Sequence, residues 1–417
     1  MIGRANSFSE AAHNGASGEN RHPLPVRGGV HASQCAPLAV LRLALSNFRS
    51  YISAELSTSG RCVVLAGPNG AGKTNLLDAL SLLTPGRGLR GATLAEHTRK
   101  GPSAAEHPLW AVSATVKRGT HSHEVGTGLS AGASGATRQV RLNGAPAQSS
   151  ADLGELVPMV WLTPAMDRLF IESASGRRRF LDRLTLGFDS SHAQRSLRYE
   201  QATRERARLL KFGPRDPAWL DGLEEQMAET GLAIAASRAS TVERLNEALG
   251  ERRLMGCFPC AQLAMRGEID SLVFQSANAE RKPGDLRARL KADRMRDAEA
   301  GRTSFGPHLS DLEVRDVEKR ADARECSTGE QKALLVSIVL AHARVLSHIT
   351  NGLAPVLLLD EIVAHLDATR RAALFEEILS LRAQAWMTGT DFQMFDPLQG
   401  TADLFEVADS QVRLISE

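Results

Sequence analysis

The sequence predicts an α/β fold in which a strand-rich antiparallel subdomain and a helical insertion lobe interrupt the α/β core. A short apolar run over 61–66 leads into a glycine-rich loop and then into a helical pattern over 75–83. Short alternating segments with Gly-rich turns fill about 109–145, which is typical of antiparallel strands. Residues from about 176 to 300 have helical patterns, and alternating strands and helices return after them. The α/β core is therefore discontinuous in the sequence.

The composition is that of an ordinary globular protein and argues against a membrane-spanning class. The chain has 417 residues, 42% hydrophobic and 24% charged, and its net charge of +2 says little about partners. No apolar run approaches the roughly 20 residues that span a bilayer, and the N-terminus lacks the apolar core of a secretory signal. We therefore expect a cytoplasmic protein with no membrane partner.

Two features of the sequence are expected to carry no function. Residues 1–37 are rich in Gly, Ala, Ser, Asn and His and have no hydrophobic period, so we expect a disordered extension or a start placed upstream of the natural one. Cys257 and Cys260 form a single C-x-x-C pair, and a zinc site would need two further ligands. A buried, reduced pair is favoured over metal binding.

The elements before the insertion follow from short-range patterns. Apolar and β-branched runs predict the strands, and the spacing of Leu76, Leu77, Leu80 and Leu83 predicts the helix. The expected strands lie at 38–43, 61–66, 110–116, 138–144 and 157–162, and the helix lies at 75–83.

The insertion and the C-terminal third are read in the same way. Within the insertion, breaks near Gly213-Pro214 and around 256–259 favour a folded helical lobe over a long rod. After residue 300 we expect helices at 333–346 and 368–381 and strands at 356–359 and 385–388.

The segment from Gly67 to Thr74 is a phosphate-binding loop. Its glycines let backbone N–H groups turn toward an anion at the positive end of the following helix. Lys73 is expected to reach the β- and γ-phosphates of ATP, and the Thr74 hydroxyl to bind Mg²⁺. The candidate nucleotide-binding residues are Gly67, Pro68, Asn69, Gly70, Ala71, Gly72, Lys73 and Thr74.

Asp360 and Glu361 end the apolar strand predicted at 356–359. A carboxylate at the carboxyl edge of a parallel sheet reaches the magnesium shell, so Asp360 is the second candidate metal ligand. Glu361 is the candidate general base for the attacking water. The alternative is that both carboxylates cap the next helix; the phosphate loop and the nearby Asp367 weigh against it.

Ser327-Thr328-Gly329-Glu330-Gln331 precedes the helix predicted at 333–346. On its own it is an ordinary capping box, with Ser327 as the cap and Glu330 three residues later. About 30 residues before Asp360, it is instead typical of the γ-phosphate sensor that one ATPase subunit donates to another. Ser327, Gly329 and Asp367 therefore complete the candidate site.

Together these motifs describe an ABC-type ATPase head whose site closes when two copies meet. Lys73, Thr74, Asp360 and Glu361 of one subunit are expected to act with Ser327 of the other in a two-fold dimer. The expected domains are a disordered extension at 1–37, the ATPase lobe at 38–175 and 301–417, and a helical insertion lobe at 176–300.

Beyond the general ATPase motifs, the chain resembles the RecF family from about residue 38 to its end. The segments that carry the resemblance are 45–51 (LSNFRSY), 162–164 (LTP), 175–182 (SGRRRFLD), 304–312 (SFGPHLSDL) and 327–332 (STGEQK). The resemblance implies an ATP-dependent homodimer that binds double-stranded or gapped DNA and hydrolyses ATP weakly, assisted by DNA. It also implies RecR-like and RecO-like partners and the loading of RecA at single-stranded gaps.

Two positions depart from the pattern of related ATPases. No glutamine is identifiable in the lid region before Thr163-Pro164, and the strand and turn at 386–391 offer no switch histidine. The γ-phosphate contacts of those two loops are left unassigned.

An arginine-rich stretch is the candidate DNA-binding surface. Residues 168–215 contain twelve Lys and Arg against five Asp and Glu, and Arg177, Arg178 and Arg179 are consecutive. Such a face gives sequence-independent, salt-sensitive affinity for phosphates. The alternative is a solvated surface that pairs internally with Glu200 and Glu205. Aromatic residues at 5% argue against a base-stacking platform, so duplex or junction DNA is the expected target. The other basic residues of this candidate surface are Arg195, Arg198, Arg204, Arg206, Arg208 and Lys211.

Three other functions remain open from the residues alone. A transporter ATPase needs a coupling surface for a membrane partner and a shorter, more acidic insertion. An SMC-like clamp needs hundreds of coiled-coil residues, for which the insertion is too short. An adaptor that binds ATP without turnover has no need of Glu361.

Overall fold

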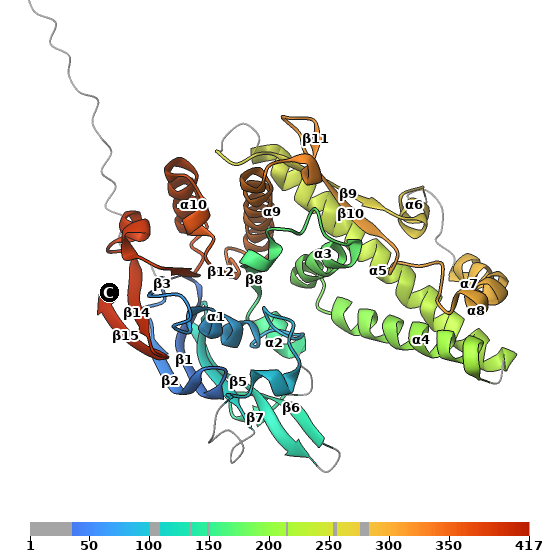
Figure 1. Ribbon diagram of the computed structural model, residues 1–417, viewed down its shortest axis with the longest axis horizontal. Helices are drawn as coiled ribbons and strands as arrows, with labels where there is room; N and C mark the ends of the chain where they lie inside the picture. The colour runs from blue at the N-terminus through green and yellow to red at the C-terminus, as the bar shows by residue number, and fades with distance from the viewer. Residues whose placement is uncertain are drawn as a thin grey trace, which may run out of the picture. The chain divides into compact units, whose positions relative to one another are not determined.

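A six-stranded sheet lies at the centre of the α/β part, in a computed structural model of the chain (Figure 1). The structure describes residues 36–100, 109–132, 135–147, 151–213, 216–252, 257–275 and 283–416. The central sheet is parallel except for its last pair, β14 with β15. In spatial order its strands are β15 (Gln411–Ser416), β14 (Ala402–Ala408), β3 (Cys62–Ala66), β13 (Ala385–Gly389), β12 (Val356–Leu359) and β8 (Met159–Leu162).

Both faces of the central sheet are buried at β3, β12 and β8, whose residues are apolar at every position. In β12, Val356 and Leu358 join the core around α1 (Lys73–Ser81), whereas Leu357 and Leu359 join the core around α9 (Thr328–Ile349). Alternate residues of a strand point to opposite faces, so one short apolar run supplies two cores. Helix α10 (Ala368–Ser380) packs on the α9 side.

An antiparallel sheet covers α1 on the side away from the central sheet (Figure 1). The buried Gln384 joins the two sheets: it accepts from the Val40 N–H at 2.7 Å and donates to the Val40 oxygen at 3.1 Å. The strands in order are β2 (Tyr51–Ser57), β1 (Leu38–Phe48), β4 (Ala111–Arg118), β5 (His121–Gly132), β6 (Gly135–Leu142) and β7 (Ala145–Pro146).

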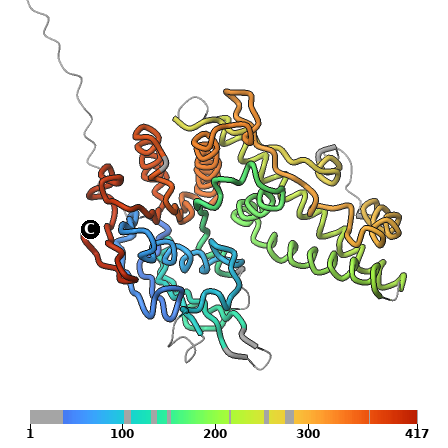
Figure 2. Tube along the Cα trace, in the orientation of Figure 1, coloured from blue at the N-terminus to red at the C-terminus, as the bar shows by residue number. Residues whose placement is uncertain are grey.

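The helical insertion is a folded lobe, as its breaks predict. Figure 2 shows α4 and α5 side by side, and α6 and α7 pack on the same apolar cluster. The helices are α3 (Ala174–Phe188), α4 (His192–Phe212), α5 (Pro217–Arg252), α6 (Glu268–Gln275), α7 (Pro283–Ala292) and α8 (Arg294–Ala300). Short helices elsewhere are α2 (Ala151–Leu156), η1 (Leu94–His97), η3 (Pro164–Met166), η5 (Ala323–Glu325), η6 (Val363–His365) and η7 (Phe392–Leu398).

The expectation that 176–300 is helical throughout is wrong at β9 (Ala261–Arg266). This strand pairs antiparallel with β10 (Asp311–Asp316), which also pairs with β11 (Ala321–Asp322). Its buried positions Ala261 and Leu263 alternate with exposed ones, the pattern of a half-buried strand. Because this pairing crosses residue 300, the domain boundary placed there stays a prediction.

The expected strands and helices otherwise coincide with observed ones. The strand predicted at 356–359 has those bounds, whereas β1 runs on to Phe48 and α9 begins at Thr328. Strands β2, β10, β11, β14 and β15 were not anticipated. Helix α9 is long and apolar enough to cross a membrane, but 72% of its apolar window is buried in the core.

Some expectations fall on parts of the chain that are not described. Residues 1–35, with most of the expected extension, and the break positions Pro214 and Gly256 lie outside the described residues. Ala36, at the end of that extension, is buried and donates its N–H to the Gly60 oxygen at 2.9 Å.

The C-x-x-C pair is not buried as a pair. Cys257 is exposed, whereas Cys260 is buried and contacts the Leu249 oxygen through its sulfur at 3.4 Å. Within the described ranges, no group of three or more His, Cys, Asp or Glu side chains is placed to hold a metal ion.

Arg206 corrects one part of the expected basic surface. Its side chain is fully buried and donates to Glu224 at 3.0 Å, to Asp297 at 2.6 Å and to the Leu290 oxygen at 2.7 Å. A buried guanidinium is retained only where such partners offset its lost hydration. Arg206 therefore holds α4, α5 and α8 together and is not a surface residue.

We expect Arg206→Met to destabilise the protein by about 3–5 kcal/mol, because it leaves Asp297 buried without its cation and Glu224 with Arg294 alone. Urea unfolding followed by circular dichroism measures the change. Arg208→Ala is the matched control, because solvent screens its exposed pair with Glu205 and the pair adds little to stability. Equal effects of the two substitutions would contradict the structural role of Arg206.

His342 makes folding sensitive to acid. Its buried Nε2 lies 2.7 Å from the Leu184 oxygen, and burial lowers the pKa of His342 to about 4. Between pH 6.5, the value for an exposed histidine, and pH 4, only the unfolded chain takes up this proton. Stability from His342 is therefore complete above that window and is lost as the pH falls through it.

We expect His342→Gln, which keeps a donor for Leu184 but does not titrate, to flatten this part of the pH profile. The wild-type free energy of unfolding should fall by up to about 3 kcal/mol more than that of the variant between pH 7 and pH 4. Parallel profiles for the two proteins would show that His342 is not the titrating group.

Candidate functional site

The carboxyl ends of four parallel strands bring the candidate residues to one edge of the central sheet. Gly67 follows β3, Asp360 follows β12, Thr388 lies near the end of β13, and Thr163 follows β8. Loops at this edge of a parallel sheet are where ligands bind. The two halves of the expected site thus meet, although the insertion separates them in the sequence.

The phosphate loop needs glycine at two positions for steric reasons. Gly72 has φ = 113°, and a Cβ there would lie 2.6 Å from the Tyr51 hydroxyl. A Cβ on Gly67 would lie 2.0 Å from the Val407 oxygen. The loop therefore runs closely between the antiparallel sheet on one side and β14 on the other.

Lys73 lies inside the phosphate loop. Its ammonium donates to the carbonyl oxygens of Gly67 at 2.6 Å and Pro68 at 2.9 Å, and the residue is 4% exposed. Burial lowers the pKa of Lys73, and the negative charges of Glu361 and Asp360 oppose that shift. The loop thus holds a buried cation beside the N-terminus of α1, an arrangement that attracts an anion.

Asp360 is joined to Thr74 and Thr388. The Thr74 hydroxyl lies 2.9 Å from one carboxylate oxygen of Asp360 and 3.1 Å from the other, and the Thr388 hydroxyl donates to the first at 2.9 Å. Burial raises the pKa of Asp360, and the two threonine hydroxyls oppose the rise. A carboxylate and a hydroxyl side by side are hard oxygen ligands, so Thr74 and Asp360 fit Mg²⁺.

Glu361 has a strained backbone that Thr388 fixes. Its φ of 53° lies in the left-handed region, which costs a non-glycine residue free energy. The Glu361 N–H donates to the Thr388 hydroxyl at 2.8 Å. One hydroxyl therefore accepts from the candidate base and donates to the candidate metal ligand. Sequence reasoning missed Thr388, because it looked for a histidine in this strand.

Ser327 and Gly329 begin α9 and are exposed. The Ser327 N–H donates to the Glu330 carboxylate at 2.9 Å, which is the capping-box bond. Lys319, together with that N–H, lowers the pKa of Glu330 to about 2. The capping box is therefore present. Ser327 and Gly329 are still exposed and can contact another molecule.

Asp367 caps α10, since its carboxylate accepts from the Arg370 N–H at 2.8 Å. The segment that follows Thr163-Pro164 contains a second residue that sequence reasoning missed. Asp167 forms an ion pair at 2.9 Å with Lys332, which is 4% exposed and lies in the first turns of α9. This segment is therefore tied to the helix that carries Ser327.

The arginine run divides into three different environments. Arg177 is 8% exposed and makes a bidentate pair with Asp311 at 2.7 and 2.8 Å. Arg178 donates to the Ser310 oxygen at 2.6 Å and is half-buried, whereas Arg179 is exposed. Arg177 is thus a structural residue that fixes α3 to β10, and its expected contact with DNA is withdrawn. Arg179 stays a candidate.

Comparison with known proteins shows the family to which this chain belongs. The model of the RecF/RecN/SMC N terminal domain matches residues 39–412. DNA replication and repair protein RecF of Rhizobium etli (strain CIAT 652) is 47% identical over 376 residues, which are 90% of this chain and 98% of that protein. The chain belongs to the RecF family. The RecF protein of Mesorhizobium japonicum is 49% identical over 368 residues, with 88% and 96% of the two chains covered.

Solved structures agree on the fold of this RecF-family chain. One described as the recombination mediator protein RecF-ATPrS in the RecFOR pathway has a TM-score of 0.76 and 22% identity, and the match covers 93% of this chain and 100% of that one. The resemblance to RecF and the ABC-type ATPase head are therefore confirmed. The family is one of DNA replication and repair proteins.

We expect Thr388→Val to slow ATP hydrolysis about tenfold or more, because it frees the strained Glu361 backbone and removes a hydrogen bond from Asp360. Thr388→Ser restores the hydroxyl and should recover most of the rate. Steady-state kinetics should show the loss in kcat with KM for ATP nearly unchanged. A serine variant as slow as the valine variant would mean that Thr388 acts only through packing.

Proposed function

We propose that this RecF-family chain is an ATP-dependent DNA-binding recombination mediator. It dimerises on ATP, binds duplex or junction DNA and helps to load RecA at single-stranded gaps during repair and replication restart. One observation carries the proposal: Lys73, Thr74, Asp360 and Glu361 converge at one sheet edge, while Ser327 is exposed at the start of a different helix. A head with that layout lacks one wall of its site until a second copy supplies it.

ATP and Mg²⁺ are the ligands that the residues fit. Residues 67–74 would hold the phosphates through backbone N–H groups and Lys73, and Thr74 and Asp360 would hold the metal. Bound Mg²⁺ supplies charge neutralisation at the phosphates. Glu361 would take the proton of the attacking water, at a carboxylate whose backbone Thr388 positions.

The second copy would supply Ser327 and Gly329. The N-terminus of α9 presents backbone N–H groups and a hydroxyl, which suit the terminal phosphate of a nucleotide held by the partner. Asp367, exposed at the start of α10, belongs to the same proposed interface. ATP then acts as a ligand of the dimer and shifts the equilibrium away from monomers, and hydrolysis reverses the shift.

DNA would bind to exposed cations of the helical lobe, not to the whole arginine-rich stretch. Arg179, Arg198, Arg204 and Lys211 are exposed. Contacts of this kind go to the phosphate backbone and carry no sequence preference. A weak, DNA-stimulated ATPase follows from a dimer that both ATP and DNA favour.

The proposed partners come from the family. A solved structure is described as the recombination mediator protein RecF-ATP in the RecFOR pathway, which supports RecR-like and RecO-like mediators as partners here. A RecA filament as a further partner rests on the family resemblance. The proposed place of action is the cytoplasm, where DNA gaps arise. An SMC-like clamp or adaptor without a role in loading RecA is the alternative. Assembly of RecA on gapped DNA coated by single-strand-binding protein, with and without this chain, separates the two.

We expect two inactive variants to restore activity when mixed. Lys73→Ala lacks its own phosphate-loop cation, and Ser327→Arg blocks only the surface donated to a partner. A mixed dimer then keeps one intact composite site, so about a quarter of the wild-type ATPase rate should return.

Two controls accompany this experiment. Each variant alone should be inactive, and light scattering of Glu361→Gln with ATP and Mg²⁺ should show a dimer. A mixture no faster than its components, together with a Glu361→Gln chain that stays monomeric, would mean that the site is not shared between copies.

A further inference from the structure

A cavity of about 770 Å³ lies between the loop that follows α1 and helices α3 and α4, with β8 on its floor. Four arginines line it: Arg87, Arg90, Arg179 and Arg183. The acidic side chains that line it are Asp182 and Glu200. It is separate from the phosphate loop, which sits at the opposite end of α1. Arg90 reaches toward the nucleotide site, since its charge opposes the rise in the pKa of Asp360; Arg87, Arg179 and Arg183 have no role in the site described above.

The acidic residues do not neutralise this arginine cluster. Asp182 accepts from Arg238 at 2.7 and 2.9 Å and lies 2.8 Å from His192 Nε2, so its charge is already paired outside the cluster. Glu200 is exposed on α4. The cavity therefore carries a net positive charge.

The arginines are not all equally free. Arg90 donates to the Asn75 side chain at 3.1 Å, so its guanidinium is already partly engaged. Arg87 and Arg179 are exposed, and over the described ranges neither makes a side-chain hydrogen bond or an ion pair. These two guanidiniums stand at the mouth of the cavity with their donors available.

Arg183 lies deeper and lacks an acceptor. Its guanidinium stacks on the Trp161 ring, 4.1 Å from the ring centroid. Its Nη1 is buried and, among the residues that the structure describes, has no hydrogen-bond partner. Burial, with the charge of Arg179, lowers the pKa of Arg183 to about 9. An anion at this place would satisfy the donor and stabilise the cation.

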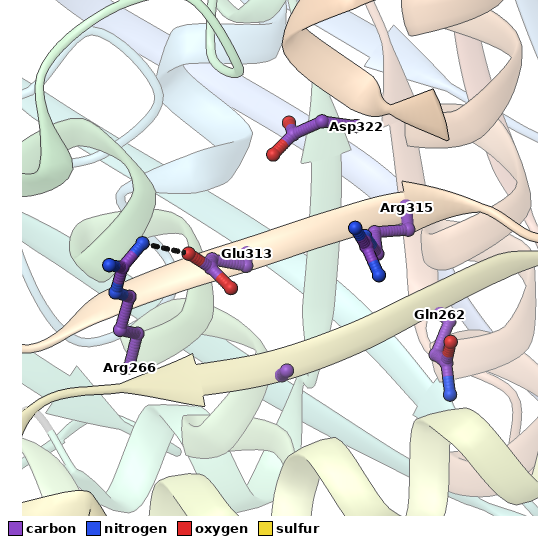
Figure 3. Close-up of a pocket in the computed structure, with 6 residues that line it drawn as sticks. Gln262, Arg266, Glu313, Arg315 and Asp322 are labelled. Carbon is purple, nitrogen blue, oxygen red and sulfur yellow. Dashed lines mark hydrogen bonds and ion pairs between the residues drawn. The ribbon is translucent and has the colours of Figure 1, made fainter. Parts of the chain in front are cut away.

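A second concave site on the same molecule also contains arginines, but there they lie beside acidic side chains. A groove of about 470 Å³ is lined by residues of β9, β10 and β11. Figure 3 shows Arg266 and Arg315 in it, together with Glu313 and Asp322. Arg266 is paired with Glu313 at 2.8 Å. The charges in this groove balance, so it has no preference for an anion.

We propose that the arginine-lined cavity receives phosphate groups of a nucleic-acid strand, with Arg87 and Arg179 at its mouth and Arg183 inside. This inference rests on the DNA binding proposed above and names where the strand would enter. A guanidinium presents paired donors that match two oxygens of one phosphate.

The surface beside the cavity favours a nucleic acid over a short acidic peptide. The cavity-lining Leu197 and Glu200 lie on α4 at helical spacing with Arg204, Arg208 and Lys211, all exposed. Residues at such intervals share one face of a helix. That face extends about 15–20 Å beyond the cavity. Its cations, Arg204, Arg208 and Lys211, span about 10 Å of the helix, and cations in such a row suit the regularly spaced phosphates of a strand.

The test compares two double variants that remove the same charge. Arg87→Ala/Arg179→Ala alters the cavity, and Arg266→Ala/Arg315→Ala alters the balanced groove. All four side chains are exposed, so both proteins should fold, and thermal unfolding checks this. Binding of a labelled duplex is measured by anisotropy with ATP and Mg²⁺ over a range of salt concentrations.

We expect the cavity variant to bind the duplex about tenfold more weakly at moderate salt. The slope of log affinity against log salt should become shallower by about 2, one for each lost phosphate contact. The groove variant should stay within about twofold of wild type. Arg183→Gln should weaken binding in the same direction, and affinity for a fluorescent ATP analogue should not change.

Each other outcome is decisive. An unchanged cavity variant beside a wild type that binds DNA removes the cavity from the DNA path and leaves the proposed function standing. Equal losses in both double variants would reveal a general charge effect. Loss of ATP binding would assign the cavity to the nucleotide, and displacement of the duplex by poly-glutamate at equal charge would assign it to acidic proteins; both overturn the proposal. A wild-type chain that binds no duplex overturns the proposed function itself.

Discussion

The parallel pairing of β3, β13 and β12 is the constraint on which the rest of the candidate site depends. Because these strands run in one direction, the phosphate loop, Asp360 and Thr388 arrive at the same edge from three distant parts of the chain. Register matters as much as direction. A slip of one residue in β12 would exchange its two buried faces and move Asp360 away from Thr74. The two apolar cores that fix this register therefore hold Asp360 beside Thr74.

The antiparallel sheet and β14 add a second constraint, on the shape of the phosphate loop. Tyr51 approaches the loop at Gly72, and Val407 approaches it at Gly67, so the backbone has little freedom between them. Glu361 has a similar dependence, since its left-handed backbone persists only while Thr388 accepts its N–H. Placement of the phosphate loop and of the candidate base therefore relies on residues outside the motifs that carry the chemistry.

The sequence was sufficient where function depends on local pattern and insufficient where it depends on tertiary contacts. The phosphate loop, the β12 strand and Asp360 have short signatures with fixed spacing, and the structure has these elements where the patterns place them. Thr388 has no such signature, because its importance comes from hydrogen bonds to residues far along the chain. Strand β9 did have a signature, an alternation over six residues, but its helical surroundings concealed it.

The arginines show most clearly the difference between what local sequence predicts and what tertiary contacts determine. Counting arginines along 168–215 suggests a continuous DNA-binding face, but Arg177 and Arg206 are buried in ion pairs: the first holds α3 to β10, and the second holds α4, α5 and α8 together. A buried guanidinium without compensation is costly, so a fold keeps one only where carboxylates or carbonyl oxygens surround it. The buried arginines Arg177 and Arg206 follow this rule, because each has carboxylate partners. Arg183 does not follow it: its guanidinium stacks on Trp161, and one of its buried donors has no acceptor among the described residues. The positive charges of Arg87 and Arg179 in the same cavity indicate that the partner of Arg183 would be an anion. Unsatisfied cations are thus better markers of a ligand than the local count of basic residues.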